Sequence, residues 1–164
     1  MRKIAERMGS SVAPIYVNFK NVDELLETLL EKIMSVCRKL LAEENSGSPL
    51  RDIGSASLRF AMEYSVIFRD LAIKSGKYMQ GYDEKMMPAL IEEMQKDPGL
   101  NGFTVEELKT ILLKMRIFQL GLSMMAANSL LPKDYSKQEM MDILSSTADD
   151  VIMSAKLRRG LFKK

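Results

Sequence analysis

Apolar residues recur at steps of three and four along almost the whole chain, and this spacing restricts the fold more than any other feature. Such steps place side chains on one face of an α-helix, whereas a half-buried strand requires strict alternation of apolar and polar residues. The sequence contains no run of such alternation. We therefore expect an all-α protein in which amphipathic helices pack around shared apolar surfaces.

Capping signals and helix breakers divide this pattern into two short helices followed by longer ones. Residues 21–24, 104–107 and 136–139 each place Glu three positions after a capping residue, which is typical of a capping box at the start of a helix. The expected helices cover residues 2–8, 11–19, 21–44, 49–74, 83–96, 104–131 and 136–159, with a turn bracketed by Gly76 and Gly81.

The absence of histidine argues against several classes of enzyme. Histidine is the commonest general base and the commonest metal ligand, and Cys37 is the only cysteine, so neither a zinc site nor a Ser-His or Cys-His nucleophile can be built. Carboxylate chemistry stays open, but acidic pairs such as Glu92 and Glu93 are sequence neighbours that diverge around a helix. We expect no catalytic site, no metal site and no cofactor.

The sequence favours a cytoplasmic protein. No segment approaches the roughly 18 uninterrupted apolar residues of a membrane span, and the basic residues near the start are not followed by the apolar region of a signal peptide. A single cysteine cannot form an internal disulfide and suits a reducing compartment. We therefore expect no membrane partner.

Charge is unevenly distributed although the net charge is only +2. Residues 1–22 carry four basic side chains and one acidic one, and the last fourteen residues carry five basic side chains and no acidic one. A basic N-terminal region can follow the phosphates of nucleic acid. The basic C-terminal segment is better explained as a complement to a helix dipole, with Gly160 as a terminator.

The two short helices around Gly9 predict a helix-turn-helix, in which the second helix enters the major groove of DNA. This region contains Ile4, Ala5, Gly9, Ser11, Ile15, Tyr16, Phe19, Lys20, Glu24 and Leu25. At these places the chain resembles the TetR family of transcription regulators, which has Ile-Ala, Gly, Ser, Leu-Tyr, Phe-Lys and Glu-Leu there. The resemblance implies a small DNA-binding head, a two-fold dimer built by the last two long helices, and an inducer cavity in the larger domain.

The resemblance also assigns the contacts with double-stranded DNA. Ser11 can cap the second helix, and Lys20 would bind phosphate. Two alternatives stay open, in which Tyr16 packs half-buried within the head and Lys20 is merely solvated. The residues assigned to DNA are Ser11, Val12, Ala13, Tyr16, Val17, Asn18 and Lys20.

Three features depart from the family pattern. The family has a further helix before this motif, whereas Met1 falls where that helix has ended, so we expect a head that lacks its first helix. Val22 replaces the usual Lys, which removes one phosphate contact and about one unit of salt dependence. Val12, Ala13 and Pro14 offer no side-chain donors to base edges. Either the sequence begins too late, or this is a shortened member whose operator binding is in doubt.

The larger domain is expected to hold the ligand cavity. We place the boundary inside the third helix, with a head over residues 1–44 and a ligand-binding and dimerisation domain over residues 45–164. Fourteen methionines suit a cavity for varied apolar ligands, although plain core packing remains the alternative for any single one. Arg116, Gln119 and Ser123 could bind a polar end of the ligand or pair across a dimer. The predicted cavity residues are Met62, Phe68, Met79, Tyr82, Met86, Met94, Met115, Arg116, Phe118 and Gln119.

Two apolar helices near the C-terminus predict a homodimer. Each must bury its stripe, and two helices from each subunit would make a four-helix interface. Alternatively, both stripes serve only a monomeric core. The predicted interface residues are Gly121, Met125, Met140, Ile143, Leu144, Thr147, Ala148, Val151, Ile152 and Ala155.

These features together predict a TetR-like repressor. A small hydrophobic or amphipathic ligand would favour a body conformation whose two heads no longer match half-sites about 34–36 Å apart. The alternative is a dimeric helical ligand-binding protein that has lost operator binding with its first helix.

Overall fold

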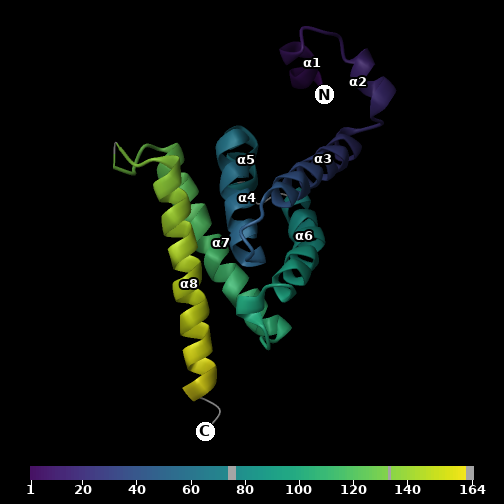
Figure 1. Cartoon of the computed structure of the whole chain (residues 1–164). Helices are drawn as coiled ribbons and strands as arrows, with labels where there is room; N and C mark the ends of the chain where they lie inside the picture. Colours follow the sequence, from purple (N-terminus) through teal and green to yellow (C-terminus); the bar gives the residue numbers. More distant parts are fainter. Residues whose placement is uncertain (74–76, 133, 162–164) are drawn as a thin grey trace. The chain divides into compact units, whose positions relative to one another are not determined.

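The computed structural model describes residues 1–73, 77–132 and 134–161, and this part of the chain is all-helical, as the apolar spacing predicts (Figure 1). The elements of this part are α1 (Arg2–Arg7), α2 (Ala13–Asn18), α3 (Val22–Glu43), α4 (Pro49–Glu63), α5 (Ser65–Ile73), α6 (Lys77–Gln95), the 3-10 helix η1 (Pro98–Leu100), α7 (Val105–Ala127) and α8 (Lys137–Leu161).

The chain divides into two compact units, residues 1–36 and residues 37–164. We call them the head and the body. The division falls inside α3, the helix in which the sequence analysis places the boundary, but it comes after residue 36 rather than after residue 44. The C-terminal part of α3 therefore belongs to the body.

In the head, Gly9 ends α1 as its position in the motif predicts. Its backbone has a φ of +64°, in the left-handed region. The N–H of Gly9 donates to the carbonyl of Glu6 at 3.1 Å, and the N–H of Ser10 donates to the carbonyl of Ala5 at 3.0 Å. This pair of bonds is a Schellman motif, which favours glycine because a Cβ destabilises the left-handed conformation.

The second helix of the head begins differently from the expectation. Val12 is the N-cap of α2, and no side chain accepts a hydrogen bond there, so the prediction that Ser11 caps the helix is wrong. Pro14 occupies the second helical position and has no N–H, which removes a donor that a cap would bind. The hydroxyl of Ser10 instead donates to the carbonyl of Ser11 at 3.1 Å.

The capping boxes of α7 and α8 are confirmed. At α7, the N–H of Glu107 donates to Thr104 Oγ1 at 3.3 Å, and the N–H of Thr104 donates to the Glu107 carboxylate at 2.7 Å. At α8, the N–H of Glu139 donates to Ser136 Oγ at 3.2 Å, and the N–H of Ser136 donates to the Glu139 carboxylate at 2.7 Å. At α3, Asn21 accepts from the N–H of Glu24 at 2.9 Å, but the Glu24 carboxylate accepts from the N–H of Lys20.

Four helix limits in the body differ from the sequence prediction. Gly160, expected to end the last helix, lies within α8, which runs to Leu161. The helix expected over residues 49–74 is two helices, α4 and α5, separated at Tyr64 by a non-helical backbone. Gly81 lies within α6 rather than at the end of a turn, because one glycine costs a helix only about 1 kcal/mol. Helix α7 ends at Ala127, with Asn128 as its C-cap, and does not continue to Leu131.

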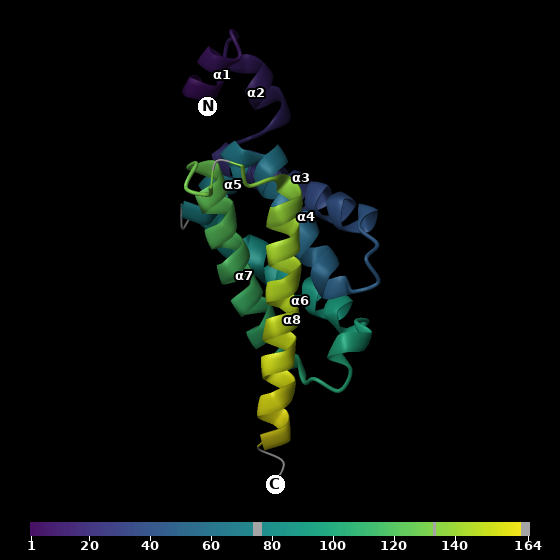
Figure 2. The same ribbon diagram turned by 60° about the vertical axis from the view of Figure 1, so that its left-hand side comes forward.

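Helix α4 lies at the centre of the body and contacts α5, α6, α7 and α8 (Figure 2). Its Leu58 is completely buried, together with Met94 of α6 and Leu108 and Leu112 of α7. Gly54 allows the close approach of α4 and α8, since a Cβ at that position would lie 3.3 Å from the side chain of Leu144.

A buried carboxylate joins two helix starts at the base of this core. Asp97, which is 2 % exposed, accepts from the hydroxyl of Ser48 at 2.7 Å and from the N–H of Leu50 at 3.1 Å. Its other oxygen accepts from the N–H of Gly99 at 2.8 Å. Asp97 therefore caps both α4 and η1, which explains why Ser48 makes no cap bond of its own.

Candidate functional site

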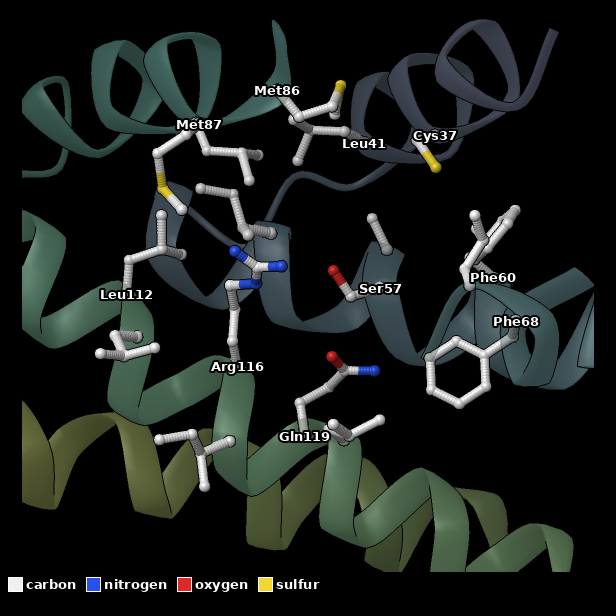
Figure 3. Close-up of a pocket in the computed structure, with 17 residues that line it drawn as sticks. Cys37, Leu41, Ser57, Phe60, Phe68, Met86, Met87, Leu112, Arg116 and Gln119 are labelled. Atoms are coloured by element: carbon white, nitrogen blue, oxygen red, sulfur yellow. The ribbon is translucent and has the colours of Figure 1, made fainter. Parts of the chain in front are cut away.

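The body contains a cavity of about 400 Å³. Its walls come from the C-terminal part of α3 and from α4, α5, α6 and α7, all within the body (Figure 3). This size lies within the range of about 300–1,000 Å³ that is usual for small-molecule sites. The lining residues are Cys37, Leu41, Ile53, Ala56, Ser57, Phe60, Phe68, Leu71, Met86, Met87, Leu90, Leu112, Leu113, Arg116, Ile117, Gln119 and Leu120.

A small polar group interrupts this apolar lining. Arg116 and Gln119 project from α7 in the direction of Ser57 on α4. The amide of Gln119 donates to the hydroxyl of Ser123 at 3.1 Å, and Ser123 is itself only 4 % exposed. Gln119 is thus held by a buried neighbour on the same helix, which fixes its side chain at the cavity wall.

The α7 wall of the cavity is accessible to solvent. Leu113 and Ile117 are 55 % and 63 % exposed, and Leu120 is also exposed, although all three line the cavity. Their three- and four-residue spacing places them on one face of α7. Exposed apolar side chains beside a cavity are typical of a surface that meets a ligand or another protein.

Four of the residues that the sequence assigned to the cavity do line it: Phe68, Met86, Arg116 and Gln119. The core of the body accounts for the other four whose side chains are described. Met94 and Met115 are buried in that core, and Met62 and Phe118 pack against it partly buried. Met79 and Tyr82 lie outside the residues whose side chains the structure describes.

The direction in which each side chain leaves its helix explains why some predicted residues line the cavity and others pack into the core. On α7, Leu112, Arg116 and Gln119 face the cavity, whereas Met115 and Phe118 lie on the side of the helix that packs into the core. Counting steps of three and four from Arg116 would have separated these sets. The contributions of α3 and α4, such as Cys37 and Ser57, carried no comparable signal, because they depend on which helices become neighbours.

The residues proposed for a dimer interface fall into two groups. Met140, Leu144 and Ala148 are buried in the core of a single chain, and Val151, Ile152 and Ala155 pack against that core partly buried. Their stripe on α8 is therefore covered by the body itself. Thr147 is half-buried and donates to the carbonyl of Ile143 at 2.7 Å.

The second group lies on the surface. Gly121, Met125 and Ile143 are exposed. Two exposed residues that the sequence analysis did not single out, Met153 and Leu157, share a face of α8 with Ile143 and are each 61 % exposed.

In the head, the residues assigned to DNA are almost all exposed. Tyr16 and Val17 are 53 % and 83 % exposed, so Tyr16 is not the half-buried packing residue of the alternative interpretation. The amide of Asn18 donates to the carbonyl of Pro14 within α2 at 2.8 Å. Ser11, Ala13 and Lys20 are also exposed, and Val12 is half-buried.

The described side chains show no group of three or more Cys, Asp or Glu arranged to hold a metal ion. In the same part of the chain, no helix combines the length and the apolar character needed to cross a membrane. Comparisons of the chain with models of protein families, with curated proteins and with solved structures found no match.

Proposed function

We propose that this chain is a TetR-like transcription regulator, a repressor whose DNA binding is released by a small hydrophobic or amphipathic ligand. The observation that carries the proposal is the cavity of about 400 Å³ in the body, with an apolar lining and a polar group on α7. A pocket of this size and character is the usual form of a small-molecule site.

The head supplies the second support. α1, the turn at Gly9 and α2 form a short helix pair, and Tyr16, Val17 and Lys20 lie on its surface. In this proposal α2 enters the major groove, the apolar side chains contact thymine methyl groups, and Lys20 binds phosphate. The basic residues Arg2 and Lys3 add to the attraction for DNA.

We also propose that the protein acts as a homodimer in the cytoplasm. Met125 of α7 and Ile143, Met153 and Leu157 of α8 are large apolar residues on the surface of a single chain. A two-fold pairing of these helices would cover them in both subunits at once. A dimer would also present two heads to a two-fold operator.

The second candidate is a dimeric helical ligand-binding protein without operator binding. It is favoured by the small amount of packing in the head, where only Ala5 and Ile15 are buried among residues 1–20. A helix pair with so few buried contacts is free to open locally, and a mobile head would pay more entropy to bind DNA.

Selection from a random pool of duplex DNA tests the two candidates. If the chain is a regulator, the selection should enrich an inverted-repeat DNA sequence. The protein should then bind this duplex more tightly than a scrambled duplex of the same composition at the same salt concentration. Lys20→Ala should weaken binding to both duplexes, with a smaller salt dependence. Equal binding to selected and scrambled duplexes would reject the regulator and leave the ligand-binding protein.

A further inference from the structure

The described part of the cavity wall carries a single sign of charge. Among the lining residues that the structure describes, Arg116 is the only charged one, and none of them is Asp or Glu. An arginine keeps its positive charge at all physiological pH values. A cavity of this kind therefore favours a ligand with a negative group and disfavours a cationic one.

The position of Arg116 suits a carboxylate. The guanidinium points into the cavity, whose lining also includes Ser57 and Gln119 (Figure 3). A guanidinium presents a planar fork of donors that matches the two oxygens of a carboxylate. The Ser57 hydroxyl is a further donor for a carboxylate, and the Gln119 amide keeps one N–H besides the one that it donates to Ser123. A bound carboxylate would add to the contacts that Arg116 makes within the chain.

The remainder of the cavity suits an alkyl chain. Phe60 and Phe68 lie on one side of the polar group, and Met86 and Met87 lie on the other. Methionine is flexible and polarizable, so these walls can adapt to a chain without a fixed shape. If each heavy atom of the ligand takes about the volume of a water molecule, roughly 30 Å³, the 400 Å³ holds roughly a dozen non-hydrogen atoms.

We infer that the body binds a medium-chain monocarboxylic acid of about 8–12 carbons, the chain length that this volume allows. Its carboxylate pairs with Arg116 beside Ser57 and Gln119, and its alkyl chain fills the apolar remainder of the cavity. This inference rests on the ligand cavity of the proposed function and names the chemical class that the cavity selects.

Calorimetric titration of the full chain, without DNA, tests the ligand class. The probes are decanoate, decan-1-ol and decylamine, each below the concentration at which it self-associates. Decanoate should bind about 10- to 100-fold more tightly than decan-1-ol, as expected for a charged hydrogen-bonded pair, and decylamine should bind most weakly. Equal binding of the acid and the alcohol would overturn the inference, and so would no binding of decanoate.

Substitution of the arginine sharpens the test. Arg116→Met should lose the preference for decanoate over decan-1-ol, whereas Arg116→Lys should keep part of it because the charge remains. Arg158→Met is the matched control, since Arg158 is exposed on α8 and bonds Ser154. A decanoate affinity of Arg116→Met equal to that of the unaltered chain would reject the role of Arg116.

This experiment does not depend on operator binding. Specific DNA binding without selective decanoate binding would overturn the ligand class and leave the regulator. Selective decanoate binding without specific DNA binding would support the ligand class and reject the regulator. The comparison of head groups on the unaltered chain also keeps the test decisive if Arg116→Met fails to fold.

Discussion

The head and the body use the same kind of helix, but they bury side chains to very different extents. In the head, the buried side chains are Ala5 and Ile15 of the short helix pair and Leu30, Ile33 and Met34 of α3. In the body, α4, α6, α7 and α8 each contribute buried residues to one core, and Leu58, Met94 and Leu108 are almost inaccessible. We expect the body to set the global stability, and the head to open locally at a lower free energy. A ligand-binding core and an adaptable DNA-contacting helix pair would need this difference.

Removing a core side chain of the body should have the largest effect on stability. Leu58→Ala leaves a cavity at the centre of the body and should lower the free energy of unfolding by about 2–5 kcal/mol. Thermal unfolding followed by circular dichroism measures this loss. Leu113→Ala, at an exposed position of α7, is the control and should change stability by less than about 0.5 kcal/mol. If Ile15→Ala in the head shifted the main transition as far as Leu58→Ala, the comparison of the two units would fail.

The buried carboxylate of the body should have the next largest effect. Asp97→Ala removes the acceptor for the Ser48 hydroxyl and for the amides of Leu50 and Gly99, and should cost about 2–3 kcal/mol. Urea denaturation of the two chains gives the difference. Asp149→Ala removes an exposed carboxylate that pairs with Arg51, and this control should cost at most about 1 kcal/mol. Equal losses for the two substitutions would show that Asp97 is not a structural cap.

A backbone change in the head should have a smaller and more local effect. Gly9→Ala forces a side chain into a left-handed conformation, with a φ of +64°, at a cost of about 1–2 kcal/mol. Faster amide hydrogen exchange in α1 and α2, with no change in the core amides of α4 and α7, is the expected result. Gly121→Ala is the matched control, because this helical glycine has open space for a Cβ. Faster exchange throughout the body of Gly9→Ala, including the core amides of α4 and α7, would contradict the independence of the two units.

A change at the proposed phosphate contact should not alter stability. Lys20→Ala is expected to reduce the slope of log K against log salt concentration by about one unit, because one phosphate contact is lost. Fluorescence anisotropy with labelled duplex DNA at several salt concentrations measures this slope. Lys109→Ala on α7 should leave the slope unchanged. An unchanged slope for Lys20→Ala would assign Lys20 to solvent, the alternative that the sequence leaves open.

The smallest effect concerns the start of α8. The pKa of Glu139 is lowered by hydrogen bonds from the backbone and the side chain of Ser136. Because the folded pKa lies below the unfolded one, this contribution to stability is present above the unfolded pKa and is lost as the pH falls through the folded pKa. An NMR titration should place the pKa of Glu139 below its ordinary value of 4.5, and Ser136→Ala should raise this pKa only in part, because the backbone N–H of residue 136 still donates to the carboxylate. An unchanged pKa in Ser136→Ala would contradict a contribution of the Ser136 hydroxyl, and a pKa of 4.5 or above in the unaltered chain would contradict the capping box as its cause.

The sequence predicts the features of this fold that depend on neighbouring residues. The boxes at Thr104 and Ser136 and the turn at Gly9 are short patterns whose hydrogen bonds close within a few residues. The break at Tyr64 has no such pattern, since neither Gly nor Pro marks it. The apolar stripe on α8 predicts that this face is buried but does not predict which surface covers it. The spacing of Leu144 and Ala148 in the sequence is the same whether they pack against α4 or against a second subunit. Half of the predicted cavity side chains that the structure describes line the cavity, because methionine content alone does not give the phase of a helix.

The most direct test of the account is the affinity of the full chain for its selected duplex, measured by fluorescence anisotropy with and without decanoate. Ligand control of DNA binding predicts that saturating decanoate weakens binding of the unaltered chain by about 5- to 150-fold, the usual range of coupling between two sites. Arg116→Met, which keeps the head intact, should bind the duplex equally with and without decanoate. An affinity of the unaltered chain that decanoate does not change, at concentrations that fill the cavity, would contradict the account.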